Sequence, residues 1–324
     1  MDISSLLQQP CIFDIIISDF GRESAIEFIR SLAIIEKRII HTYLDQPDME
    51  FYDEYRRIMF VFIGDIAYFK RAQIERYRQK GYLDERILLG IGDLEIPDDI
   101  RDRLIYSTLE QIYVGLNHGY DNIRIVIPCN TLSPLGFHLR QLLLDKEQAL
   151  KLLRTTLGSE LRSEIIERLK QAKFSIYTVP TIVLDEITKS RGTKADLLVL
   201  GTTPIMEIYK SEVDNMRLDY KLLELSKADQ TLINRTVVAA IDGDASVVRQ
   251  MRQRIDADVI NPRKQQNQEM VVVEACTDFD LALGINSREV FVHRLVYDAY
   301  GLTNGHKLHM KIKSRPRIRK KPGE

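Results

Sequence analysis

Two cysteines in similar surroundings are the residues of this chain best suited to chemistry. The stretches "PCNT" (128–131) and "ACTD" (275–278) both follow an apolar run and place polar side chains directly after the cysteine. A thiol tuned by its surroundings exchanges its proton near neutral pH. If Cys129 and Cys276 flank one carbon atom, one thiolate removes a proton and the other thiol donates one to the opposite face. The pair therefore predicts inversion at a stereocentre.

A structural role is the alternative for each cysteine, because a cysteine outside a disulfide is usually a small buried hydrophobe. For one such residue alone, packing would be the better interpretation, but two matching motifs favour chemistry. Cys11 stands at the start of an apolar run, where packing is expected. Three scattered cysteines in 324 residues do not predict a disulfide framework.

Apolar runs of strand length alternate with longer stretches of helical period. They are "CIFDIIIS" (11–18), "IMFVFIG" (58–64), "IRIVIP" (123–128), "FSIYTV" (174–179), "DLLVLG" (196–201) and "MVVVEA" (270–275). This alternation predicts α/β units whose parallel sheets are covered on both faces, of the Rossmann-like or flavodoxin-like kind. The leucine-rich stretch 144–173 is predicted to be a helical connection between two such units. Residues 261–269 have no apolar period and are predicted to be a loop.

The carboxyl ends of parallel strands are where ligands bind in such sheets. Cys129 is expected at such an end, with Ser133 as the N-cap of the next helix and Pro134 in its first turn. The backbone N–H groups of that turn favour an anion, which is either the thiolate or a substrate carboxylate. Asn130 and Thr131 add an amide and a hydroxyl at the same place.

Composition restricts the other function classes. The net charge of −1 predicts neither a nucleic-acid partner nor an anionic membrane, and no apolar stretch reaches the length of a membrane span. With no signal-peptide pattern at the N-terminus, we expect a cytoplasmic protein. The last 18 residues carry eight Lys or Arg, predicting a solvated tail or, as the alternative, a site for an acidic partner. The six histidines show no metal-type spacing and no phosphate loop is present, so no metal is expected.

These motifs resemble those of the aspartate/glutamate racemase superfamily, the cofactor-independent amino-acid racemases. "PCNT" and "ACTD" look like the two cysteine motifs of that family. Four further segments are similar to family segments: "SDFGRES" (18–24), "FIGDIAY" (62–68), "VLGTTPIMEIYKSEVD" (199–214) and "KADQTLINRTVVAAIDGD" (227–244). The resemblance thus touches most of the chain between about residues 11 and 300.

The resemblance implies a racemase of aspartate or glutamate that needs no cofactor, with its active site in the cleft between two domains. It gives Cys129 and Cys276 the acid/base roles, with Asp19 and Asp278 as aspartates that orient the thiols or accept their protons. The residues implied on the substrate side are Asn130, Thr131, Thr277, Phe20 and Thr202. It also implies a homodimer and a first domain of residues 1–143 plus 287–324, with 144–286 as the second.

Three departures from the family pattern leave alternatives open. Phe20 replaces a small polar residue, Arg22 and Glu23 replace glycines, and "YFKR" stands where a Pro-Tyr-Gly triplet is expected after Asp65. Asp19 and Asp278 also suit helix N-caps, and Asp65 a loop or cap. The alternatives are a related isomerase or decarboxylase of another small carboxylate, or a racemase-like binding or regulatory protein without turnover.

Overall fold

The strands of this protein form two four-stranded parallel sheets. The computed structural model describes residues 12–17, 28–35, 58–61, 98–130, 132–158, 161–241, 244–276 and 284–299. The first sheet has the order β2-β1-β3-β4, with β1 Ile12–Ile17, β2 Ile58–Val61, β3 Asn122–Ile127 and β4 Lys173–Thr178. The second has the order β6-β5-β7-β8, with β5 Lys194–Leu200, β6 Asp219–Leu222, β7 Val271–Glu274 and β8 Ile285–Asn286. The prediction of two α/β units with parallel sheets is confirmed.

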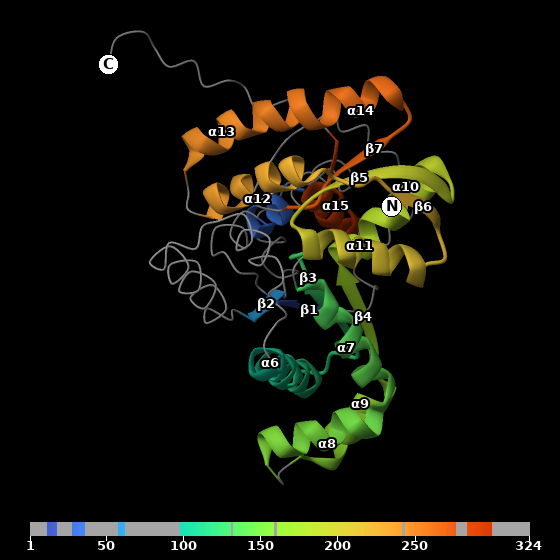
Figure 1. The fold of residues 1–324 in the computed structure, drawn as a ribbon. Coiled ribbons are helices and arrows are strands. Elements are labelled where there is room, and N and C mark those ends of the chain that lie inside the picture. The colour runs from blue at the N-terminus through green and yellow to red at the C-terminus, as the bar shows by residue number, and fades with distance from the viewer. Residues whose placement is uncertain are drawn as a thin grey trace, which may run out of the picture.

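Helices cover both sheets, and one layer of them lies between the sheets (Figure 1). Residues 28–35 are helical. The labelled helices of the first half are α6 Asp98–Asn117, α7 Ser133–Leu144, α8 Lys146–Leu157, α9 Ser163–Gln171 and α10 Val179–Arg191. Those of the second half are α11 Thr203–Asn215, α12 Lys227–Ile241, α13 Ala245–Arg254, the π-helix η1 Ile255–Ile260, α14 Asn261–Gln266 and α15 Ser287–Ala299.

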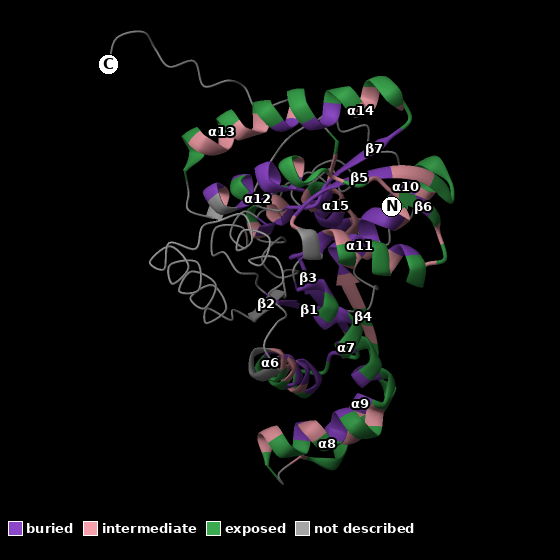
Figure 2. Ribbon diagram, viewed as in Figure 1, coloured by how far each residue is buried: buried purple, intermediate pink, exposed green. Residues whose placement is uncertain are grey.

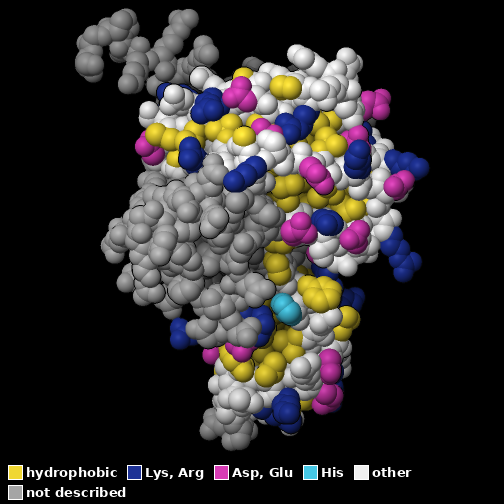
Figure 3. Space-filling model, in the orientation of Figure 1, with side chains coloured by type: hydrophobic (Ala, Val, Ile, Leu, Met, Phe, Trp, Pro, Cys, Tyr) yellow, Lys and Arg dark blue, Asp and Glu magenta, His cyan; other side chains and the backbone are white. Residues whose placement is uncertain are grey.

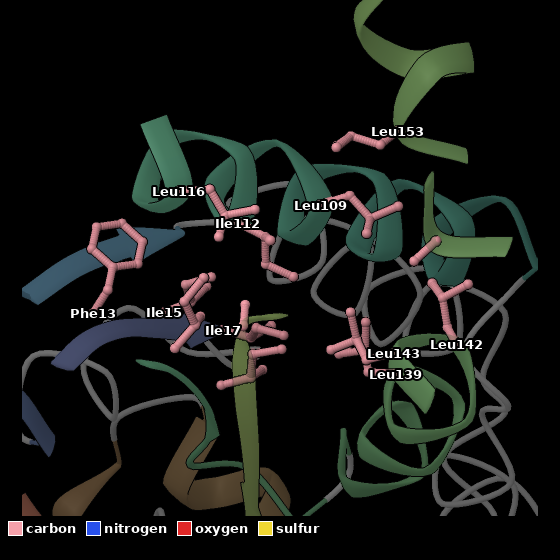
Figure 4. Close-up of a cluster of buried hydrophobic side chains, with 14 of the residues drawn as sticks. Phe13, Ile15, Ile17, Leu109, Ile112, Leu116, Leu139, Leu142, Leu143 and Leu153 are labelled. Carbon is pink, nitrogen blue, oxygen red and sulfur yellow. The ribbon is translucent and has the colours of Figure 1, made fainter. Parts of the chain in front are cut away.

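The central strands of the first sheet, β1 and β3, are buried on both faces because each face meets a different helix layer. Phe13, Ile15 and Ile17 of β1 point to one side, where they meet Ile112 and Leu116 of α6 (Figure 4). Together with side chains of β3, α7, α8 and α9 they form what we call the α6 cluster. The intervening side chains of β1 and β3 point to the opposite side. This two-sided burial explains the nearly continuous apolar runs in the sequence.

The second sheet is buried in the same way. Val199 and Val273 belong to the central cluster, which also includes Ile16 and Val126 of the first sheet and side chains of α10, α11 and α15. On the other face, Leu198, Leu200 and Val272 pack with α12 and η1, in what we call the α12 cluster. Figure 2 shows the buried residues in the sheets and on the inward sides of the helices, with exposed residues on the outer surfaces of α8, α13 and α14.

The position of β4 corrects the expected role of the helical stretch 144–173. β4 pairs with β3, with Asn122 opposite Lys173, so it belongs to the first sheet. The helical stretch 144–173 contains α8 and α9 and connects β3 with β4 inside that sheet. Its leucine-rich composition predicted a connection between the two units, and this prediction is wrong. The apolar run 174–179 therefore cannot be grouped with the second unit, and the boundaries 1–143 plus 287–324 and 144–286 remain a prediction.

The loop expected at residues 261–269 is in part a helix, α14. It follows η1 without a break, and Pro262 lies in its first turn, where a missing N–H group is tolerated. The polar composition that predicted a loop instead reflects exposure of this helix to solvent.

A buried ion pair joins the first sheet to α15. Arg124 on β3 donates through Nε and Nη2 to the two carboxylate oxygens of Asp14 on β1, each at 2.5 Å. Its Nη1 donates to the backbone carbonyl of Leu295 at 2.8 Å. Burial by itself would lower the pKa of Arg124, but the charge of Asp14 outweighs it and the pKa is raised. The pair therefore holds a charged group stably inside the sheet and anchors the last turn of α15.

The outer surface carries charges of both signs. On the face drawn in Figure 3, Lys and Arg are interspersed with Asp and Glu across the described residues. Among those residues, no helix is both long and apolar enough to cross a membrane.

Candidate functional site

Cys129 lies just past the carboxyl end of β3. The strand ends at Ile127, and α7 begins at Ser133 with Pro134 in its first turn. Ser133 was predicted to be the N-cap of α7, and this prediction is wrong. Its hydroxyl instead donates to the carbonyl of Cys129 at 3.1 Å. Leu132 occupies the cap position instead. Ser133 thus closes the turn around Cys129, while the N-terminus of α7 stands beside it as expected.

Cys276 lies at the corresponding place in the second sheet. β7 ends at Glu274, and the N–H of Ala275 donates to the carbonyl of Leu200 at 3.0 Å. This bond keeps the end of β7 paired with the end of β5, so Cys276 is held against the point where β5 turns into α11. Neither cysteine forms a disulfide.

Thr202 stands at the carboxyl end of β5, next to the end of β7. It occupies the N-cap position of α11, where its carbonyl accepts from the N–H of Met206 and its side chain makes no cap hydrogen bond. A Cβ atom on the preceding residue, Gly201, would lie 3.4 Å from the Cβ of Ala275, which shows how closely the two strand ends approach. The structure therefore brings Thr202 and Cys276 to one edge of the second sheet.

One hydrogen bond links the two sheet edges. The hydroxyl of Tyr209, on α11, donates to Oδ1 of Asn130 at 3.3 Å. Asn130 is only 3% exposed and Tyr209 is fully buried. Burial raises the pKa of the Tyr209 phenol, so the hydroxyl keeps its proton and remains a donor. Asn130, predicted from the sequence to face a substrate, therefore lies where the first sheet meets α11 of the second unit.

A second contact supports this meeting of the two units. Glu212, one turn beyond Tyr209 on α11, interacts electrostatically with Arg140 of α7. Burial raises the pKa of Glu212, and the positive charge of Arg140 opposes that rise in part. The helices that follow β3 and β5 therefore face each other beside the candidate site.

The two thiols are not packed in the same core. Cys129 is 6% exposed and belongs to the α6 cluster, while Cys276 is 7% exposed and belongs to the α12 cluster. The central cluster lies between these two. Each side chain is thus held by its own unit, and a ligand shared by both thiols would have to reach them from the carboxyl ends of β3 and β7.

Five of the predicted site residues lie outside the described residues: Asp19, Phe20, Thr131, Thr277 and Asp278. Cys11 and Asp65 lie outside them as well. The described part of the site consists of Cys129, Asn130, Thr202 and Cys276.

Two polar residues near Cys276 had no role in the sequence-based prediction. Gln230 and Asn234 are both buried on α12, and Gln230 Nε2 donates to Asn234 Oδ1 at 2.9 Å and to the carbonyl of Gly201 at 3.0 Å. They support the end of β5 from the side of the α12 cluster. The sequence did contain a signal, because two amides four residues apart interrupt the apolar face formed by Ile233 and Val237.

No metal site is apparent in the part of the chain that the structure describes. None of its His, Cys, Asp and Glu residues gather in a group of three or more that could hold a metal ion.

No family model matches the sequence, and no curated protein matches it. Among solved structures, the chain is similar to Picrophilus torridus aspartate racemase, with 15% sequence identity and a TM-score of 0.46. The match covers 90% of this chain and 98% of that chain. At this level of similarity it does not assign an activity.

Proposed function

We propose that this protein is a racemase of an acidic amino acid, aspartate or glutamate, and that it works without a cofactor. Cys129 and Cys276 are the acid/base pair. The observation that carries the proposal is the matched position of the two residues, each at the carboxyl end of a strand inside its parallel sheet. Such strand ends are the usual ligand sites of α/β sheets. The Asn130–Tyr209 hydrogen bond, which joins the two units beside Cys129, adds support.

In the proposed reaction, the thiolate of one cysteine removes the α-proton of the bound amino acid. The carbanion that forms is neutralised on its opposite face by a proton from the other thiol, and the configuration is inverted. The reverse reaction exchanges the roles of the two cysteines, so one proton is taken up and one is released in each direction. Acid–base groups of this kind each contribute roughly 10²- to 10⁴-fold to the rate.

The remaining roles follow from the resemblance of the motifs. Asn130, Thr131 and Thr277 hold the carboxylate or amine of the substrate, and Thr202 and Phe20 lie on the substrate side. Asp19 and Asp278 orient the thiols or accept their protons. The N-terminus of α7 favours negative charge beside Cys129.

One observation favours a second candidate function. Both cysteine side chains are buried in separate apolar clusters, as would be expected if they only filled space. The second candidate is therefore a racemase-like protein that binds a small carboxylate without turning it over.

The test is to incubate the protein in deuterated water with the L and D forms of aspartate and glutamate, following loss of the α-proton signal. We expect exchange and inversion with at least one of the four. We expect Cys129→Ala and Cys276→Ala each to reduce the rate by roughly 10²-fold or more. Cys11→Ala is the matched control and should retain the wild-type rate.

If the protein exchanges the α-proton of none of these four amino acids, the proposal that it is a racemase of aspartate or glutamate is wrong. Saturable binding of one of the four amino acids by calorimetry, without exchange, would then support the second candidate.

A further inference from the structure

Of the two polar atoms in the side-chain amide of Asn130, one forms a hydrogen bond within the described residues and the other does not. Its Oδ1 accepts from Tyr209, but its Nδ2 is completely buried and has no hydrogen-bond partner among the described residues. A buried donor that lacks an acceptor lowers the stability of the folded state, so such atoms are rare in folded proteins. Nδ2 is thus a donor held ready, at the end of β3, for an acceptor that the described part of the chain does not supply.

The hydroxyl of Tyr209 decides which end of the amide is left without a partner. Its only hydrogen bond among the described residues is the one to Oδ1 of Asn130. If the amide were turned over, Nδ2 would face the hydroxyl, and the phenolic proton would lose its acceptor. The raised pKa of Tyr209 means that this proton is always present. The tyrosine therefore fixes the amide with its nitrogen directed away from α11.

The backbone holds Tyr209 in place for this task. Ile205, Tyr209 and Val213 follow one another at four-residue spacing on α11, and all three are buried in the central cluster. The ring is thus packed on a rigid helix, and its hydroxyl reaches Asn130 of the first unit. A group held in this way can orient its neighbour at little entropic cost.

We propose that Tyr209 is a positioning residue, which orients the amide of Asn130 so that Nδ2 donates to a carboxylate oxygen of the bound amino acid. This rests on the proposed function and names the group that sets the geometry of its anion site. Because Nδ2 is shielded from solvent in this structure, a ligand reaches it only after a local opening of the strand ends. Tyr209 acts from the second unit on a residue of the first, so it also couples ligand binding to the contact between them.

The test is the variant Tyr209→Phe, which removes the hydroxyl and keeps the ring. A hydrogen bond to a charged group contributes a factor of roughly 10 to 150 to binding. Loss of orientation alone should cost less, so we expect KM to rise about 5- to 30-fold and kcat to change less than about threefold. Asn130→Ala should raise KM at least as much, and the double variant should match Asn130→Ala alone.

A purely structural tyrosine would act differently, because its effect on KM would add to that of Asn130→Ala. The matched control is Tyr220→Phe. That buried tyrosine bonds to Thr188 and to the carbonyl of Gly192, in the second unit and away from Asn130. It should lower the melting temperature while leaving KM within about twofold of the wild-type value. The melting temperature of Tyr209→Phe, measured alongside, shows whether that variant is folded.

Calorimetry with L-aspartate and with succinate separates this proposal from the proposed function. If the wild-type protein binds either but racemises nothing, and Tyr209→Phe weakens that binding, the positioning role stands and the racemase assignment fails. If the wild-type protein racemises but Tyr209→Phe leaves KM within twofold, or its effect adds to that of Asn130→Ala, the positioning role is overturned. A wild-type protein that neither binds nor racemises overturns both.

Discussion

The substitution Arg124→Met tests the packing that holds β3 and its cysteine. Methionine retains much of the apolar stem of arginine, but it removes the two bonds to Asp14 and the bond to Leu295. Asp14 is 8% exposed, so its carboxylate would be left buried without a counter-charge. Removing one partner of a buried ion pair costs about 3–5 kcal/mol of folding free energy.

The third hydrogen bond of Arg124 is lost in the same substitution. The lost hydrogen bond to the carbonyl of Leu295 adds about 1 kcal/mol to this penalty. We therefore expect Arg124→Met to lower the free energy of unfolding by about 4–6 kcal/mol.

The measurement is urea denaturation of the wild type and of Arg124→Met at pH 7, followed by far-ultraviolet circular dichroism. A double variant in which Asp14→Leu is added should recover most of the loss, because an apolar pair leaves no buried charge. Lys194→Met is the matched control, since it breaks an exposed ion pair with Asp219 and should cost less than about 1 kcal/mol. A loss below about 1 kcal/mol, or a loss that Asp14→Leu does not relieve, would refute the reasoning.

Two further predictions concern the surroundings of the second sheet. In Gly284→Ala, the new Cβ would lie 2.4 Å from the backbone carbonyl oxygen of Val272; we expect a loss of about 1–3 kcal/mol in urea denaturation, and an unchanged midpoint would contradict this packing. Burial opposes ionisation of Asp229, but hydrogen bonds from Arg263 and Ser226 outweigh it and lower the pKa of that carboxyl. Its stabilising contribution is therefore present above the unfolded-state pKa of about 4 and is lost as the pH falls through the lower folded-state value. The difference in melting temperature between the wild type and Asp229→Asn should thus be present at pH 7 and shrink as the pH falls below the unfolded-state pKa of about 4; a difference that does not shrink on acidification would count against the ion pair.

The strands and their ends were predictable because they depend on local sequence. The runs that form β1, β3 and β7 are buried on both faces, and the cysteines directly follow two of them, so Cys129 and Cys276 could be placed at strand ends without a structure. The charge in each of "CIFDIIIS" and "IRIVIP" was also a usable signal, since Asp14 and Arg124 have opposite signs and lie on adjacent strands.

The features that could not be predicted depend on contacts between distant segments. The run 174–179 has strand character by itself, but only the crossover through α8 and α9 decides that it pairs with β3. Asn130 and Tyr209 are 79 positions apart, and their contact follows from how α11 packs on the first unit. Ser133 has the side chain of an N-cap, yet in the folded turn its hydroxyl meets the carbonyl of Cys129 first.

The central claim is that two cysteines act on one carbon from opposite faces. It is tested most directly by measuring α-proton exchange and inversion separately for each enantiomer of the best substrate, in Cys129→Ala and in Cys276→Ala. We predict that inversion is lost in both variants. Any exchange that survives should be confined to one enantiomer in the first variant and to the opposite enantiomer in the second. Inversion by either single variant at a rate within about tenfold of the wild type would contradict the claim, because one thiol would then suffice.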